Sequence, residues 1–260
     1  MSQEDHKAFA ALAGRLDPVR LRILVRMAEA LATEVRSTLN PSSDFLTPSL
    51  GSALGSQLLL HHATHEEKLN KKTFEYILKY GCEAVGHRVT LNANPTFPAE
   101  DLNINGTSFS LKTQADKGIK AASVYVQKLM EARWIRDFST SEELTAEARQ
   151  RIGTHLAQYE RMLVLRAFDV PGNGYRYELV EVPLPVLRLV SSLPDGAFPG
   201  KNKAGSSGAD VGDHGGVAFR VLLDGSVEKV RVFNLRIDRC IIHGEWHIPR
   251  LVVPGKSDEE

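Results

Sequence analysis

An aspartate and a lysine, Asp101 and Lys112, lie in a stretch whose sequence predicts a tight β-hairpin. The Asn-Gly pair at 105–106, with alternating residues on both sides, is typical of a two-residue turn that fixes strand register. In that register Asp101 lies opposite Ser110, and diagonal neighbours on one face are ~7–8 Å apart. Asp101 and Lys112 can therefore reach the same small volume.

The two faces of this hairpin differ in polarity, because side chains alternate along a strand. The face expected to join the core carries Leu102, Ile104, Phe109 and Leu111. The opposite face carries Asp101, Ser110, Lys112 and Gln114. A carboxylate there could hold Mg²⁺ beside a phosphate, and a lysine could position or deprotonate a water. The same two residues could instead form a surface ion pair on a solvated strand.

Helical patterns flank the hairpin on both sides. Segment 64–80 predicts a helix that ends at Gly81, and segment 120–138 predicts another, with Val126, Leu129 and Met130 facing inward. A third helix is expected within 139–162, which opens with capping-box spacing. The first 40 residues also read as helical, with Leu21, Ile23, Leu24, Met27 and Leu31 at helical spacing.

The last third of the chain has a different pattern. Segments 162–183 and 217–233 each contain two strand-like runs around a turn. Between them, segment 192–216 is rich in Gly and Ser and has no periodicity, which indicates a functional loop or a disordered insertion. The sequence therefore predicts a mixed α/β protein with a helical start and a strand-rich end.

Composition narrows the class of protein only modestly. The 32 Lys and Arg residues balance 32 Asp and Glu residues, so any nucleic-acid-binding surface must be local. The two cysteines, Cys82 and Cys240, indicate reduced thiols in a cytoplasmic protein. We expect no signal peptide, because the N-terminus lacks a basic region and an apolar run, and no membrane partner, because apolar runs are too short to cross a bilayer.

A set of ordered segments carries a family resemblance. They read LLLHHATH, FEYILKYG, DLNINGTSFSLKTQADKGIKAASVYVQKLMEARWI, HLAQYERMLVLRAF, YELVEVPLPVL and RCIIHGEWHIP, and they cover most of residues 57–250. In this order they resemble the SmaI-like type II restriction endonucleases of the PD-(D/E)xK nuclease superfamily. The resemblance implies a restriction-endonuclease-like mixed sheet flanked by helices. It also implies Mg²⁺-dependent cleavage of double-stranded DNA at a short palindrome by a homodimer, with CCCGGG and blunt ends as the expected site.

The resemblance assigns roles to individual residues. Asp101 matches the metal-binding acid and Lys112 the motif lysine, whereas Ser110 stands where most of the superfamily has Glu. Gln114 occupies the position two residues after the lysine. A second carboxylate is therefore expected from a helix, with Glu75 as the first candidate metal ligand and Glu131 as the second. Each could equally be a solvated helix residue, since Glu75 has lysines at i±4 spacing.

DNA contacts are expected from four lysines: Lys71 and Lys72 before the hairpin, and Lys201 and Lys203 in the loop 192–216. Each could instead be an ordinary solvated side chain. We interpret residues 1–260 as one endonuclease domain, with a helical part (1–60), a catalytic core (61–170) and a strand-rich part (171–250). Two alternative functions remain open at this point: a non-cleaving DNA-binding protein of the same fold, and a nicking endonuclease of the mismatch-repair kind.

Overall fold

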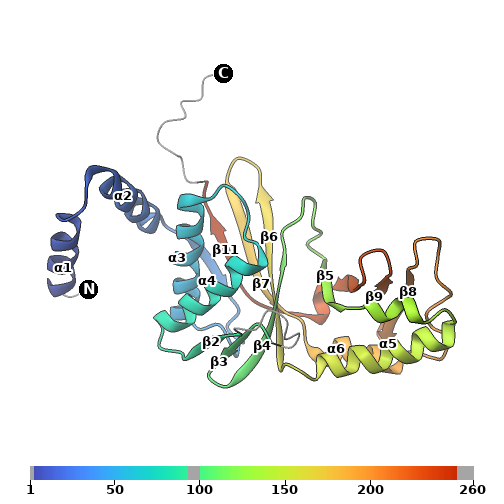
Figure 1. The fold of residues 1–260 in the computed structure, drawn as a ribbon. Coiled ribbons are helices and arrows are strands. Elements are labelled where there is room, and N and C mark those ends of the chain that lie inside the picture. The colour runs from blue at the N-terminus through green and yellow to red at the C-terminus, as the bar shows by residue number, and fades with distance from the viewer. Residues whose placement is uncertain (1–2, 93–99, 251–260) are drawn as a thin grey trace.

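The structure is a computed structural model that describes residues 3–92 and 100–250. It contains a seven-stranded sheet, a four-stranded sheet and six α-helices among these residues (Figure 1). The helices are α1 (Gln3–Ala13), α2 (Pro18–Ala32), α3 (Pro48–Thr64), α4 (Lys71–Ala84), α5 (Ser141–Leu156) and α6 (Leu184–Arg188). The predicted mixed α/β class is confirmed.

The larger sheet has the strand order β1-β11-β7-β6-β4-β3-β2. Its strands are β1 (Arg36–Leu39), β2 (Val89–Leu91), β3 (Leu102–Ile104), β4 (Thr107–Gln114), β6 (Arg161–Val170), β7 (Gly174–Glu181) and β11 (Ile241–Ile248). Only β4 and β6 pair in parallel; the other described pairs in this sheet are antiparallel. A parallel pair needs a long crossover, which β5 and α5 provide.

The smaller sheet has the order β5-β10-β9-β8 and is antiparallel throughout its described pairs. It consists of β5 (Ser123–Glu131), β8 (Ser207–Asp213), β9 (Gly216–Asp224) and β10 (Lys229–Arg236). Three short 3₁₀ segments complete the described elements: Arg133–Asp137, Leu189–Ser192 and Ile237–Arg239.

Two apolar cores cover the two faces of the larger sheet. On one face, α3 and α4 pack over residues such as Leu163 and Leu165 of β6. On the other face, Met162 and Val164 pack with α5 and the smaller sheet. Successive residues of β6 thus enter different cores, and this explains why the strand is an almost continuous apolar run rather than an alternating one.

The predicted hairpin is confirmed in turn and register. Asn105 and Gly106 both have positive φ angles, of 53° and 98°, as a two-residue turn of this kind requires. Cα partners are Leu102 with Phe109, Asn103 with Ser108, and Ile104 with Thr107. The face assignments follow, because Leu102, Ile104, Phe109 and Leu111 are all buried under α3 and α4.

The predicted helix over 120–138 is wrong. Residues 123–131 form strand β5, in which Val124 and Val126 alternate into the core, and a short 3₁₀ helix follows. This β-branched alternation competes with the helical spacing of Val126, Leu129 and Met130, and pairing with β10 decides the outcome.

Three other boundaries also differ from expectation. The first 40 residues are not helical throughout, since α2 ends at Ala32 and residues 36–39 join the larger sheet as β1. The helix expected over 64–80 is α4 alone, because α3 ends at Thr64. The segment 192–216 is not irregular throughout, because it contains strand β8. No described helix is both long enough and apolar enough to span a bilayer.

Candidate active site

The polar face of the hairpin brings Asp101, Ser110 and Lys112 together. Asp101 lies directly before β3, and its carboxylate accepts hydrogen bonds from the backbone N of Leu111 at 2.6 Å and from Ser110 Oγ at 3.5 Å. Lys112 Nζ donates to Ser110 Oγ at 2.9 Å. The serine hydroxyl therefore bridges the acid and the lysine, and the backbone amide fixes the orientation of the carboxylate.

Helix α4 adds a second carboxylate to this group. The side chain of Asn70 caps the helix by accepting from Thr73 N, and the first turn then presents two lysines toward the hairpin. Lys71 Nζ lies 2.7 Å from Asp101 Oδ1 and 3.7 Å from Glu75 Oε1. Glu75 is buried, and its carboxylate pairs with the same ammonium that pairs with Asp101.

The donor set fits a hard divalent cation. One ammonium already lies within 4 Å of both Asp101 and Glu75, so the two carboxylates face a single position that holds positive charge. Mg²⁺ takes one or two carboxylates together with water and phosphate oxygens. In this structure the ammonium of Lys71 takes the position between these two carboxylates.

Lys112 has an unusual electrostatic environment for a lysine. Burial lowers its pKa to about 8, and the charges of Lys71 and Lys128 act in the same direction. The carboxylates of Asp101 and Glu75 offset only part of this effect. A lysine with such a pKa exchanges a proton near neutral pH, which suits a base that acts on water.

Two residues that the sequence did not single out lie on the same side of the sheet. His155 and Tyr159 are buried, their rings meet edge to face at 5.5 Å, and His155 Nε2 and the Tyr159 hydroxyl have no partner among the described residues. Burial, with the charge of Lys112 adding to it, lowers the pKa of His155 to about 4. The i, i+4 spacing of two polar aromatic residues at a helix end was the signal available in the sequence.

Gln114 does not join this site. Its side chain accepts a hydrogen bond from Arg166 Nε at 3.2 Å, and the fully buried Arg166 also pairs with Glu178 at 2.8 Å. The same guanidinium donates to the carbonyls of Lys120, Ala121 and Ser123. Gln114 is thus part of a network that fixes the connection between β4 and β5.

Glu131 is placed differently from the expectation. It ends strand β5 rather than lying on a helix, its side chain is 59% exposed, and it pairs with Lys128. Its ion-pair partner is thus a residue of the same strand and not a member of the Asp101–Ser110–Lys112 group. Glu75 is therefore the helix acid that the fold brings to the hairpin.

The lysines expected to contact DNA fall into two groups. Lys71 and Lys72 are at the site, where Lys72 Nζ lies 3.0 Å from Glu75 Oε2. Lys201 reaches the carbonyl of Arg136 at 3.5 Å, and Lys203 is exposed. Their segment is anchored to α5, because Phe198 is fully buried and its backbone N donates to Thr145 Oγ1 at 3.1 Å, so it is an ordered connection in this structure.

Another acidic and histidine cluster lies on the far part of the larger sheet. Ligand atoms of Asp44, Glu181 and His243 lie within 4.8 Å of one another. Arg161 occupies this cluster, with Nη2 2.8 Å from Asp44 Oδ1 and a second ion pair to Glu181. Burial acts to raise the pKa of Glu181, but hydrogen bonds from His243 and Arg161 prevail and lower it. The guanidinium of Arg161 therefore pairs with both carboxylates of this cluster.

Comparison with known proteins identifies relatives of this chain. A family model described as SmaI, type II site-specific deoxyribonuclease, matches residues 10–248. The type II restriction enzyme SmaI of Serratia marcescens is 28% identical over 211 residues, which cover 79% of this chain and 82% of that enzyme. No solved structure gives a significant match. These matches confirm the resemblance read from the sequence, and the chain belongs to the SmaI family of type II site-specific deoxyribonucleases.

Proposed function

We propose that this deoxyribonuclease uses Mg²⁺ and the Glu75–Asp101–Ser110–Lys112 group to hydrolyse both strands of a short palindromic DNA site. The observation that carries the proposal is the convergence of two carboxylates and a low-pKa lysine on one hairpin face. The arrangement has the parts of a PD-(D/E)xK site, with the second acid supplied by α4 because Ser110 replaces the motif acid.

Each residue has a distinct part in this chemistry. Asp101 and Glu75 would hold the cation, which when bound supplies Lewis-acid polarisation of the phosphate and a water of lowered pKa. Lys112 either accepts the proton of the attacking water or stabilises charge on the phosphate, and Ser110 Oγ orients its amine at 2.9 Å. Leu111 N keeps the carboxylate of Asp101 in place at 2.6 Å.

The partner and the site follow from the same reasoning. A two-fold symmetric duplex sequence suits a two-fold symmetric protein, so the acting form is a homodimer in which each copy cuts one strand. Similarity to the SmaI enzyme makes CCCGGG, cut to blunt ends, the first sequence to test. Lys71 and Lys72 at the site, and Lys201 and Lys203 in the segment before β8, are the first phosphate and base contacts to examine.

Lys112→Ala tests the site. Its cleavage rate on a plasmid with one CCCGGG sequence should fall ~10²–10⁴-fold, since a positioned base or charge stabiliser is lost. Binding of the same duplex in Ca²⁺ should remain. Lys79→Ala is the matched control, because Lys79 is on α4 but pairs with Glu83 at 2.7 Å.

The products of the wild-type enzyme discriminate the remaining alternatives. Linear plasmid supports a restriction enzyme, whereas nicked circles alone support the repair-type reaction. Undigested plasmid with tight duplex binding supports a DNA-binding protein. Unchanged cleavage by Lys112→Ala would overturn the assignment of the active site.

A further inference from the structure

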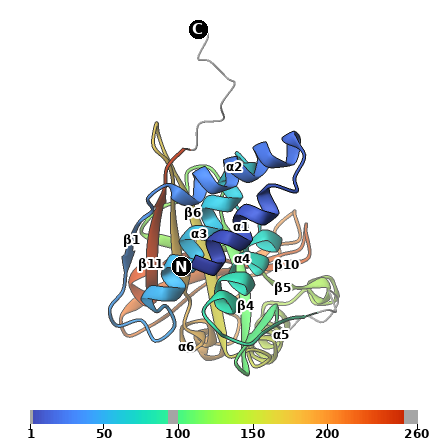
Figure 2. The same cartoon turned by 90° about the vertical axis from the view of Figure 1, so that its left-hand side faces the viewer.

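Helices α1 and α2 form an arm that stands away from the rest of the molecule. Figure 1 shows them at one side of the fold, and Figure 2, which looks onto that side, shows them in front of α3 and α4. Helix α1 buries none of its side chains, and α2, which packs against α3, buries only Ala30. The arm therefore buries almost no side chains against the core of its own chain.

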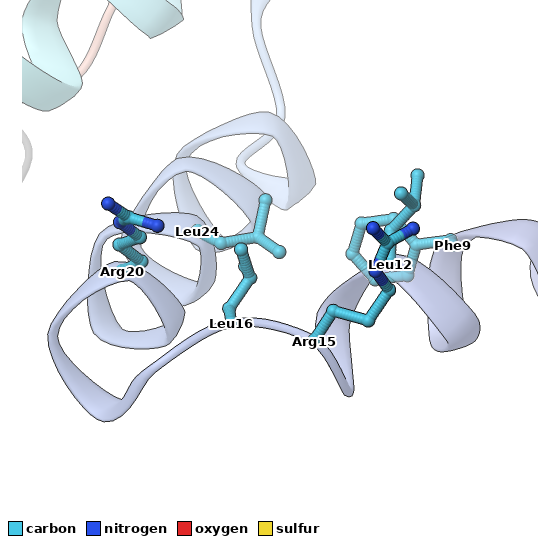
Figure 3. Close-up of a pocket in the computed structure, with 6 residues that line it drawn as sticks. All are labelled: Phe9, Leu12, Arg15, Leu16, Arg20 and Leu24. Atoms are coloured by element: carbon cyan, nitrogen blue, oxygen red, sulfur yellow. The ribbon is translucent and has the colours of Figure 1, made fainter.

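The surface of this arm is apolar. Thirteen large apolar side chains are exposed among the described residues, and seven of them lie on α1 and α2. Four are more than half exposed: Phe9 (52%), Leu12 (59%), Val19 (58%) and Ile23 (53%). A groove of about 490 Å³ separates the two helices, with Phe9 and Leu12 on one wall and Leu16 and Leu24 on the other (Figure 3).

Such helices need a partner to be stable. Isolated helices shorter than about 12–15 residues are marginal in water, and most helical stability comes from packing of an apolar face. Helix α1 has 11 residues and α2 has 15. An apolar patch of this extent on a soluble protein marks an interaction surface. The apolar spacing of α2 is typical of a helix that faces a core. A partner that covers α2 would explain why these side chains are exposed in the single chain.

The charges of the arm favour a second copy of the chain as its partner. Residues 3–32 carry five Lys and Arg against four Asp and Glu, so the arm is nearly neutral and unlike the strongly basic surfaces that bind nucleic acid. The acids Glu4 and Asp5 lie in the first turn of α1, whereas Arg22 and Arg26 lie on α2. This distribution would allow the acidic end of one arm to face the basic helix of another arm in a two-fold interface.

We propose that the α1–α2 arm is the dimerisation element, and that the arm of a second copy covers its apolar surface. This inference rests on the proposed function, because cleavage of both strands of a duplex requires two sites and each chain has one Asp101–Lys112 site. Helix α2 packs on α3, and α3 packs on α4, which carries Glu75, so packed helices join the arm to the helix of the active site.

Sedimentation velocity of the full-length protein without DNA tests the proposal. The wild type should sediment as a dimer at low micromolar concentration. The double variant Phe9→Glu/Ile23→Glu should dimerise at least about 100-fold more weakly, since it places charge in an apolar interface. Val217→Glu is the matched control, because Val217 is 55% exposed but lies on β9. Unchanged far-UV circular dichroism shows that each variant is folded.

Charge reversal identifies the partner surface. Glu4→Arg/Asp5→Arg makes both helices basic, and Arg22→Glu/Arg26→Glu makes both acidic, so each variant alone should be monomeric. An equimolar mixture should restore a dimer, because each helix then faces its opposite charge. Failure of the mixture to dimerise would overturn the two-fold pairing.

Other outcomes separate this inference from the proposed function. A wild type that stays monomeric, or a Phe9→Glu/Ile23→Glu protein that stays dimeric, overturns the arm as the interface. A protein that linearises plasmid while dimerising through another surface refutes the inference and leaves the proposed function intact. Dimerisation that depends on the arm, without Mg²⁺-dependent cleavage, supports the inference and refutes the proposed function.

Discussion

Replacing Lys71 with alanine should strengthen metal binding by this enzyme, although a basic residue near DNA is normally expected to help function. The ammonium of Lys71 lies 2.7 Å from Asp101 Oδ1 and 3.7 Å from Glu75 Oε1, in the place proposed for the cation. A metal must therefore displace it. Lys71→Ala removes this competitor and leaves two acids with less compensating charge.

The change in metal affinity equals the free energy of the Lys71–Asp101 ion pair, which the metal no longer has to break in Lys71→Ala. A hydrogen bond to a charged group contributes about 1.5–3 kcal/mol net. The side chain of Lys71 is 43% exposed, so solvent screens the pair and the lower end applies. About 1.4 kcal/mol corresponds to a tenfold change in dissociation constant. Asp101 keeps its hydrogen bond from Leu111 N, so the ligand itself stays in place.

Titration calorimetry with Mn²⁺ on the DNA-free enzyme measures this change. We expect Lys71→Ala to bind Mn²⁺ about tenfold more tightly than the wild type. Lys72→Ala is the control: Lys72 pairs with Oε2 of Glu75 and is 65% exposed, so the change in Mn²⁺ affinity should stay below about fivefold. Equal or weaker Mn²⁺ binding by Lys71→Ala would refute the competition. A loss of duplex affinity with unchanged Mn²⁺ binding would make Lys71 a DNA contact instead.

Two further predictions concern the second carboxylate and acid stability. Glu75→Ala should reduce the cleavage rate about as much as Asp101→Ala, ~10²–10⁴-fold, whereas Glu131→Ala should stay within severalfold, as single-turnover assays will show. Burial lowers the pKa of His62 to about 4, so the unfolded state binds a proton between pH 6.5 and 4 that the folded state does not. The free energy of unfolding should therefore fall by about 3 kcal/mol over that range from this residue. Urea titrations should show a shallower pH dependence of the free energy of unfolding for His62→Gln, whereas the exposed control His214→Gln should keep the wild-type dependence. An unchanged slope in His62→Gln contradicts the argument.

The hairpin was predictable because its signals are local. An Asn-Gly turn fixes the register by itself, and alternation then decides which side chains share a face. The proximity of Asp101 and Lys112 follows from this turn and from the alternation of side chains along its two strands. The structure shows this arrangement. The capping box at the start of α5 was predictable for the same reason, since Thr140 and Glu143 satisfy each other's backbone amides.

Features that depend on distant pairing were not predictable from local pattern. Segment 120–138 has both helical and alternating spacing, and only its pairing with β10, a hundred residues later, makes it a strand. That error placed Glu131 on a helix near the lysine, where the structure has an exposed strand end. Gln114 was assigned to the site by its face, but its partner Arg166 lies on β6, and nothing local to the hairpin reveals that pair.

The serine at position 110 is consistent with the charges that surround it. Ser110 is buried and its hydroxyl lies 3.5 Å from the carboxylate of Asp101. A glutamate there would bring two acids into close contact in a site with little solvent, which is costly unless a cation holds both. By taking the second acid from α4, the fold separates it from Asp101 by the ammonium of Lys71, and Lys72 compensates it further. The serine at the motif position and the lysine-rich start of α4 are therefore two parts of one arrangement: the helix that brings the second carboxylate also brings the two lysines that pair with it.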